Sequence, residues 1–281
     1  MTRDDTSPGE RPVRPGTIGA APDDPVAAYR RVYGLADEDL YAPDVLHVDG
    51  EFAGEADFVA RANRDYEVDR HGGFRIVPGE TVVVVVDMQE DFVRPDSVMC
   101  QPGAHRQLGA VRSLLDVARA HGSFVVFTAA TYPRRRVNDT PLYCAPVANG
   151  SLAVGSPGTV IAPELGARPG EPVIATKHTY DAFFGTELDS LLRGAGIRTV
   201  VICGTMTNYC CEATARGAFD RGYHVVFGSD VTSTDSAVNH VATLRTMRRG
   251  YARVMSGREI EAALAGDDSL YERAVGERRT R

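Results

Sequence analysis

The sequence lacks several features that are typical of membrane proteins, secreted proteins and metal-binding proteins. No apolar stretch approaches the roughly 20 residues that a membrane-spanning helix needs. The first residues, Met1 to Asp24, have no apolar core of the kind found in a secretory signal. Five cysteines form an odd set without zinc-like spacing, and the seven histidines are scattered. We therefore expect reduced thiols, a cytoplasmic location, no contact with membranes, and no metal or other cofactor.

The chain also has fewer basic than acidic residues. The chain carries 31 Lys and Arg against 38 Asp and Glu, a formal net charge of −7, so general affinity for nucleic acid is not expected. Its 281 residues, with 43% hydrophobic content, suffice for one α/β domain with a full core and for additional material.

Composition divides the chain into four parts. Residues 1–25 contain five prolines and are predicted to form a disordered or loosely attached tail. Residues 26–75 hold two amphipathic stretches, which predict a helical extension that packs on the core or on a neighbouring subunit; a plain surface arm is the alternative. Residues 76–265 form the main domain, and residues 266–281 a C-terminal tail.

Short β-branched runs alternate with amphipathic segments in the main domain. The predicted strands are Thr81–Val86, Phe124–Ala129, Pro172–Thr176, Thr199–Cys203, His224–Ser229 and Ala252–Val254. The predicted helices are Ala104–Ala120, Thr186–Ala195, Asn208–Arg221, Ser236–Arg249 and one that starts at Ser256. This alternation predicts an α/β fold: a three-layer α/β/α doubly wound sheet of about six parallel strands. Residues 131–170 are predicted to be a long loop region over the site.

Three of these strands end in side chains that carry chemistry. Asp87 follows a run of five valines, Lys177 follows a second strand, and Cys210 lies shortly after a third. The carboxyl ends of parallel strands meet at one edge of an open α/β sheet. If the three strands are neighbours, an acid, a cation and a thiol converge in one cleft.

Cys210 is predicted to lie in the first turn of a helix. The positive field of that helix end, together with the charge of Lys177, is expected to favour its thiolate. Backbone N–H groups that the helix has not used lie beside it and are suited to hold an oxyanion.

These segments resemble the isochorismatase-like cysteine hydrolases. The resemblance rests on Asp87-Met88-Gln89-Glu90-Asp91-Phe92, on Lys177, and on Gly204-Thr205-Met206-Thr207-Asn208-Tyr209-Cys210. The run from Phe183 to Leu192 is also similar, and the likeness covers roughly residues 76–260.

The resemblance implies a role for each matched residue. Cys210 would be the nucleophile, Asp87 the acid and base, and Lys177 their electrostatic support. A cis peptide would join Thr205 to Met206, and the N–H groups of Met206 and Cys210 would form the oxyanion hole. The family also implies a homo-oligomer, a dimer or tetramer. Nicotinamidase-like relatives carry metal-binding histidines after the second strand, but Thr128-Ala129-Ala130-Thr131-Tyr132-Pro133 has none.

Five residues are candidates for contact with the substrate: Phe92, Tyr180, Phe184, Thr205 and Tyr209. One of the two phenylalanines Phe183 and Phe184 is expected in the core instead. Asp91 is interpreted as orienting Lys177 or capping the next turn. The Arg134–Arg136 run is interpreted as solvated charge, with a substrate carboxylate as the alternative. His178 is expected to point away from the site, because side chains alternate along a strand.

The combined prediction is a metal-independent cysteine amidohydrolase. It would cleave a C–N bond of a small amide, ureido or carbamoyl compound through a Cys210 thioester, since the true isochorismatases lack the thiol. A lactam or amide of specialised metabolism is an alternative substrate. Two alternatives of another class are a thiol redox or sensor protein that uses Cys210 and Cys211, and a non-catalytic binding module.

Overall fold

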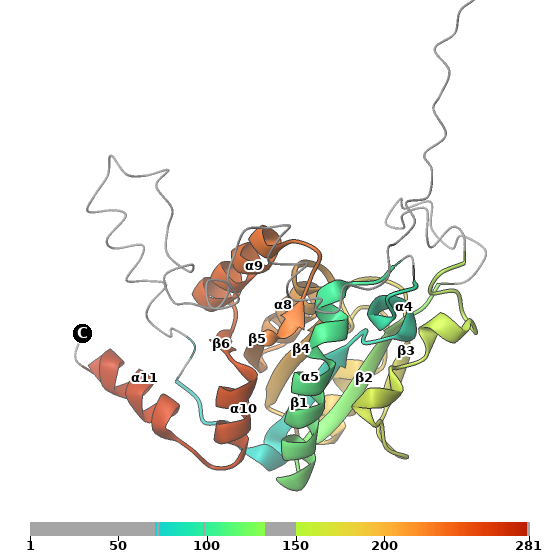
Figure 1. Ribbon diagram of the computed structural model, residues 1–281. Coiled ribbons are helices and arrows are strands. Elements are labelled where there is room, and N and C mark those ends of the chain that lie inside the picture. The colour runs from blue at the N-terminus through green and yellow to red at the C-terminus, as the bar shows by residue number, and fades with distance from the viewer. Residues whose placement is uncertain (1–70, 72, 98, 133–149, 280–281) are drawn as a thin grey trace, which may run out of the picture.

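The computed structural model describes residues 71, 73–97, 99–132 and 150–279 (Figure 1). The predicted tail of residues 1–25, nearly all of the extension of residues 26–75, and Arg134–Arg136 lie outside this set. Within the described residues, no helix is long and apolar enough to cross a membrane.

The six predicted strands form one parallel sheet. They are β1 (Thr81–Val86), β2 (Phe124–Ala130), β3 (Val173–Lys177), β4 (Thr199–Thr205), β5 (His224–Ser233) and β6 (Arg253–Met255). The strand order is β3-β2-β1-β4-β5-β6, with every neighbouring pair parallel. The predicted α/β fold is therefore confirmed.

The valine run of β1 explains how the sheet is covered. All six residues of β1 are buried, and successive side chains point to opposite faces. Val82, Val84 and Val86 belong to the core on one face, and Val83 and Val85 to the core on the other. A strand that is apolar on both sides fits only between two helical layers.

Helices cover both faces of the sheet (Figure 1). The first core receives side chains from α7 (Leu188–Gly194), α8 (Glu212–Asp220) and α9 (Ala237–Gly250). The second receives them from α5 (Pro102–Ala120) and α10 (Gly257–Leu264). The helix predicted to start at Ser256 opens with a capping box, since the side chains of Ser256 and Glu259 each accept from the other's backbone N–H.

Three local features differ from the sequence prediction. The helix expected from Asn208 begins as a π-helical turn, η6 (Thr207–Cys211), and continues as α8. A short helix, α4 (Glu90–Val93), follows β1. The predicted C-terminal tail contains α11 (Ser269–Arg279).

The described part of the long loop is held against the segment that follows β1. It contains η4 (Pro157–Thr159) and η5 (Pro163–Leu165), and Ile161 forms an isolated bridge with Gln89. A further 3-10 turn, η3 (Pro78–Glu80), precedes β1. The loop therefore lies at the carboxyl end of the sheet.

Candidate active site

The acid, the cation and the thiol predicted from three strand ends lie together. Asp87 follows β1, Lys177 is the last residue of β3, and Cys210 lies in η6 after β4. β1 and β4 are neighbours at the point where the strand order reverses. Ligands of open α/β sheets bind outside the strand ends at such a point. β2, which ends in Ala129 and Ala130, separates β3 from β1, and the Lys177 side chain reaches Asp87 across it.

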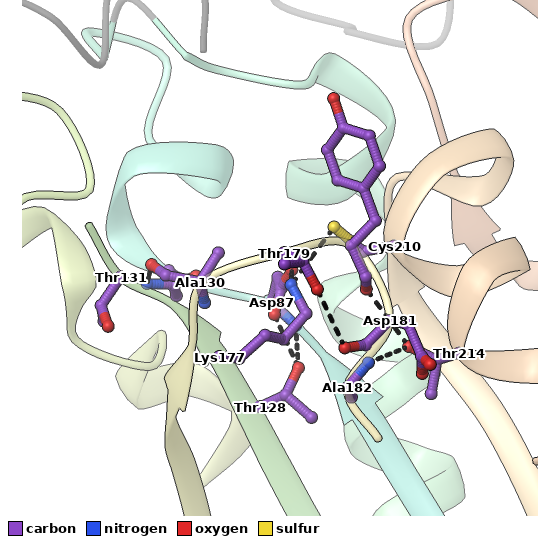
Figure 2. A network of polar contacts seen from close by, with 12 residues as sticks. Asp87, Thr128, Ala130, Thr131, Lys177, Thr179, Asp181, Ala182, Cys210 and Thr214 are labelled. Atoms are coloured by element: carbon purple, nitrogen blue, oxygen red, sulfur yellow. Dashed lines mark hydrogen bonds and ion pairs between the residues drawn. The ribbon is translucent and has the colours of Figure 1, made fainter. Parts of the chain in front are cut away.

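Lys177 bridges the other two side chains (Figure 2). Its Nζ donates to Asp87 Oδ2 at 2.6 Å and lies 3.4 Å from Cys210 Sγ. Neither the Lys177 nor the Asp87 side chain is exposed to solvent. Because water does not screen it, this ion pair is held by a stronger attraction than a surface pair.

Burial and charge set the protonation of the cluster at rest. Burial alone would lower the pKa of Lys177, but the charge and hydrogen bond of Asp87 outweigh it and raise that pKa. For Cys210 the balance is the reverse of our expectation: burial raises the pKa of the thiol despite the opposing charge of Lys177. The expectation that the helix end and Lys177 lower the pKa of this thiol is therefore wrong, because the position is too desolvated for the nearby cation to compensate.

Asp87 is held from β2 as well. Thr128 Oγ1 donates to Asp87 Oδ1 at 2.6 Å, and the Asp87 N–H lies 3.3 Å from that hydroxyl oxygen. Asp87 has a positive φ of 49°, which asparagine and aspartate adopt more readily than most residues. Both carboxylate oxygens are thus engaged, one by Thr128 and one by Lys177 (Figure 2).

Gln89 ties the segment after Asp87 to β2. Its amide exchanges two hydrogen bonds with the backbone of Ala130, at 2.9 and 3.0 Å, and donates a third to the carbonyl of Thr159. Two positions further on, Asp91 accepts from the Leu152 N–H at 2.7 Å. Asp91 thus anchors the long loop. Gly158 packs on its carboxylate so closely that an added Cβ would lie 2.1 Å away.

The turn that carries the thiol starts at the end of β4. The peptide between Thr205 and Met206 is cis, as the resemblance implied. Gln107 of α5 donates to the Gly204 carbonyl at 2.8 Å, just before that peptide. Within η6, the N–H groups of Tyr209 and Cys211 both donate to the Met206 carbonyl at 3.1 Å. These contacts fix the backbone around Cys210.

A buried histidine supports the same turn. His240 of α9 lies 3.0 Å from the Ser229 carbonyl through Nε2 and 2.8 Å from Thr207 Oγ1 through Nδ1. A carbonyl only accepts, so Nε2 carries the proton and Nδ1 accepts from the threonine hydroxyl. Burial lowers the pKa of His240 to about 4, which keeps the ring neutral near pH 7.

The loop that follows Lys177 is fastened to the helix that follows Cys210. Thr214 of α8 accepts from the Ala182 N–H at 3.1 Å (Figure 2). Within the loop, Asp181 accepts from the Phe183 N–H at 2.8 Å. His178 points away from the three side chains, with Nδ1 2.6 Å from the Thr131 carbonyl. The hydrogen bond between Ala182 and Thr214 therefore fixes the loop after Lys177 relative to the helix after Cys210.

The five residues predicted to contact the substrate differ in their exposure to solvent. Tyr180 and Tyr209 meet edge to face with ring centroids 5.4 Å apart, and Tyr209 is 41% exposed. Phe184 is 66% exposed, whereas Phe183 is buried in the core. Phe92 is buried beside Tyr132 and Leu152. Thr205 is buried and its hydroxyl donates to the Ser233 carbonyl.

No group of three or more His, Cys, Asp or Glu side chains suited to a metal occurs among the residues that the structure describes. The end of β2 and the two described residues after it, Thr128 to Tyr132, include no histidine. The absence of a metal cofactor remains a prediction.

Sequence reasoning missed the residues that hold the reacting groups in place. Thr128 gave one signal, a hydroxyl in an otherwise apolar strand. Gln89 lies inside the quoted motif, but its spacing does not reveal that it binds β2. Thr214 lies four residues after Cys210, on the same side of a helix, and only the fold shows its partner.

Comparison with known proteins agrees with this geometry. Residues 81–259 match the family model described as "Isochorismatase domain". Nicotinamidase 3 of Arabidopsis thaliana is 32% identical over 190 residues, which are 66% of this chain and 89% of the relative. Ureidoacrylate amidohydrolase RutB of Azorhizobium caulinodans is 27% identical over 209 residues, 62% of this chain and 92% of the relative.

Two solved structures share the fold. A cysteine hydrolase from Pseudomonas syringae pv. phaseolicola superposes with a TM-score of 0.62 at 26% identity, over 70% of this chain and 97% of the other. N-carbamoylsarcosine amidase from Thermoplasma acidophilum gives a TM-score of 0.53 at 28% identity, over 63% of this chain and 96% of the other.

Proposed function

Since this chain belongs to the isochorismatase family, we propose that it is a cysteine amidohydrolase that needs no metal ion. It cleaves a C–N bond of a small amide, ureido or carbamoyl compound. The observation that carries the proposal is the buried contact of Lys177 with both Asp87 and Cys210, at 2.6 and 3.4 Å. The names of the ureidoacrylate amidohydrolase and the N-carbamoylsarcosine amidase among its relatives support the substrate class.

The first half of the reaction forms a thioester. Asp87 takes the proton of the Cys210 thiol, and the sulfur attacks the substrate carbonyl carbon. The carbonyl oxygen becomes an oxyanion that accepts from the N–H groups of Met206 and Cys210. When the oxyanion collapses, the C–N bond breaks, and Asp87 donates its proton to the departing nitrogen. Ammonia or an amine leaves.

The second half of the reaction hydrolyses the thioester and releases the carboxylic acid product. Asp87 takes a proton from water, whose oxygen attacks the thioester carbon. A second oxyanion forms and collapses, the C–S bond breaks, and Asp87 returns its proton to Cys210. Lys177 keeps its charge throughout, consistent with the direction of its pKa.

The aromatic pair beside the nucleophile is proposed to contact the substrate. Tyr209 immediately precedes Cys210, is part exposed, and meets the ring of Tyr180. Tyr209→Ala should raise KM more than it lowers kcat if the ring contributes binding alone.

The function is tested by mass spectrometry of the intact protein mixed with amides, ureido acids and carbamoyl compounds, with EDTA present. Ammonia release is read in parallel, and Cys210→Ala is the control. Turnover or an acyl adduct in the wild type alone is the expected result. Turnover that survives Cys210→Ala would exclude the thioester, and turnover that EDTA abolishes would exclude a metal-independent enzyme.

A further inference from the structure

His240 links a strand of the sheet to the turn that carries the thiol. Its Nε2 donates to the Ser229 carbonyl of β5 at 3.0 Å, and its Nδ1 accepts from Thr207 Oγ1 at 2.8 Å. His240 is 3% exposed and Thr207 is not exposed, so water does not compete for the bond between them. The ring therefore ties the first residue of η6 to β5.

The place of Thr207 matters because it shares a peptide group with Met206. The Met206 carbonyl and the Thr207 nitrogen belong to one planar unit. The N–H groups of Tyr209 and Cys211, on either side of the nucleophile in sequence, both donate to that carbonyl at 3.1 Å. A shift of this peptide group would therefore move Met206 and the residues that flank Cys210 together. The side chain that holds Thr207 also sets the geometry of the proposed oxyanion hole.

We propose that His240 is a positioning residue for acyl transfer, which acts through Thr207 and keeps the N–H groups of Met206 and Cys210 aligned. The inference rests on the proposed function, in which these two N–H groups hold the oxyanion. The sulfur of Cys210 is contacted separately, by Lys177 of β3 at 3.4 Å. Loss of the imidazole should therefore disturb oxyanion binding more than it disturbs the nucleophile.

The charge state of the ring suits this role. Burial, together with a smaller effect of the charge of Arg106, lowers the pKa of His240 to about 4, although the hydrogen bond to Ser229 opposes the shift. Near pH 7 the imidazole is neutral, with one donor and one acceptor. The Ser229 carbonyl takes the donor, so the Thr207 hydroxyl gives its single proton to the acceptor. The contact has one defined direction.

The experiment compares two reagents that react with the same sulfur at neutral pH. With p-nitrophenyl acetate the sulfur attacks the ester carbon, a tetrahedral oxyanion forms, p-nitrophenolate leaves, and an acetyl thioester remains. With iodoacetamide the sulfur displaces iodide and no oxyanion forms. The ratio of the two rates reports oxyanion binding without the natural substrate. Peptide mass spectrometry locates both adducts on Cys210, and Cys210→Ala gives the background.

Two pairs of variants isolate the contact. His240→Leu removes both ring nitrogens, whereas His240→Gln keeps an acceptor and a donor. Thr207→Val removes the hydroxyl with little change of shape, whereas Thr207→Ser keeps it. Thr243→Val is the matched control. Thr243 lies on α9 with His240 and is 4% exposed, but its hydroxyl donates to Glu212 of α8 at 2.8 Å.

His240→Leu and Thr207→Val should be acylated at least about tenfold more slowly than the wild type, because a misplaced oxyanion donor loses much of its effect. Their alkylation should change by less than about threefold, since that reaction has no oxyanion. His240→Gln and Thr207→Ser should be acylated within about threefold of the wild type, and Thr243→Val should stay within about threefold with both reagents. The double variant His240→Leu/Thr207→Val should be no slower than the slower single variant, because both changes remove one contact.

Three results would overturn the inference. They are equal slowing with both reagents, acylation of His240→Gln or Thr207→Ser as slow as that of His240→Leu, and an equal loss of acylation in Thr243→Val. Failure of the proposed function looks different: the wild type would be acylated no faster than Cys210→Ala. If Cys210 is acylated in the wild type but His240→Leu keeps the wild-type ratio of rates, only the role of His240 fails.

Discussion

Replacing Lys177 by methionine probes the buried ion pair directly. Methionine keeps the length of the side chain but removes the charge, which leaves Asp87 unexposed and without its cation. Breaking a buried pair in this way costs about 3–5 kcal/mol, because the remaining charge stays desolvated. For a protein of this size, each kcal/mol shifts Tm by about 2–4 °C, so Tm should fall by roughly 6–20 °C.

The assay is urea unfolding at pH 7 of the wild type, Lys177→Met, Asp87→Asn and the double variant. If the two side chains stabilise each other, the double variant should lose less free energy of unfolding than the sum of the single losses, by at least about 2 kcal/mol. The control is Arg198→Met. Arg198 and Glu80 form a surface pair at 3.7 Å with 69% and 47% of their side chains exposed, and its loss should cost less than about 1 kcal/mol.

Either of two results would refute this reasoning. One is a Lys177→Met variant no less stable than Arg198→Met. The other is strict additivity of the two single losses, which would mean that Asp87 and Lys177 are not coupled.

Two further predictions concern the turn that carries the thiol. His240 has a pKa of about 4 in the folded state and about 6.5 in the unfolded state, so below pH 6.5 the unfolded state binds more protons and stability falls as the pH falls toward 4. Between pH 7 and pH 5 the free energy of unfolding should decrease by about 2 kcal/mol because of this residue, and this contribution should be absent in His240→Gln. Urea unfolding of both proteins at the two pH values measures the difference. An equal pH dependence in His240→Gln would contradict it. Gly204 has φ +119°, and an added Cβ would lie 2.1 Å from the Val86 carbonyl oxygen, so Gly204→Ala should lose at least about 3 kcal/mol, whereas Gly79→Ala, with open space around it, should lose less than about 1 kcal/mol. Similar unfolding midpoints for the two glycine variants would show that the close approach of β4 to β1 is not needed.

Much of the fold was predictable because β-branched runs and amphipathic segments are local signals. All six predicted strands are present, although β5 ends at Ser233 rather than at Ser229, and their alternation with helices correctly predicted two helical layers. The π-helical start at Thr207 was not predictable, because it follows from the path of β4 into α8. The helix α11 was missed since its polar sequence gives little amphipathic signal.

The reacting side chains were predictable for a different reason. Asp87, Lys177 and Cys210 each follow a strand, and parallel strands place their ends at one edge. The residues that hold them in place were not predictable, because Thr128 binds Asp87 from another strand and Thr214 binds the loop after Lys177 from a helix, and only the fold brings these segments together. The thiol was also misjudged: sequence shows the nearby cation but not the depth of burial, and burial decides the direction of the pKa of Cys210.

That burial is consistent with the proposed chemistry once the charges are added up. At rest the cluster holds a carboxylate, an ammonium and a neutral thiol, with a net charge of zero. Transfer of the thiol proton to Asp87 leaves a neutral acid, the same ammonium and a thiolate, again with a net charge of zero. Since Lys177 contacts both Asp87 Oδ2 and Cys210 Sγ, it stabilises the negative charge before and after the transfer. The step creates no new buried charge, so its cost is far below that of ionising a buried thiol alone. A protonated resting Cys210 is therefore compatible with an active nucleophile, provided that Lys177 stays between the two groups.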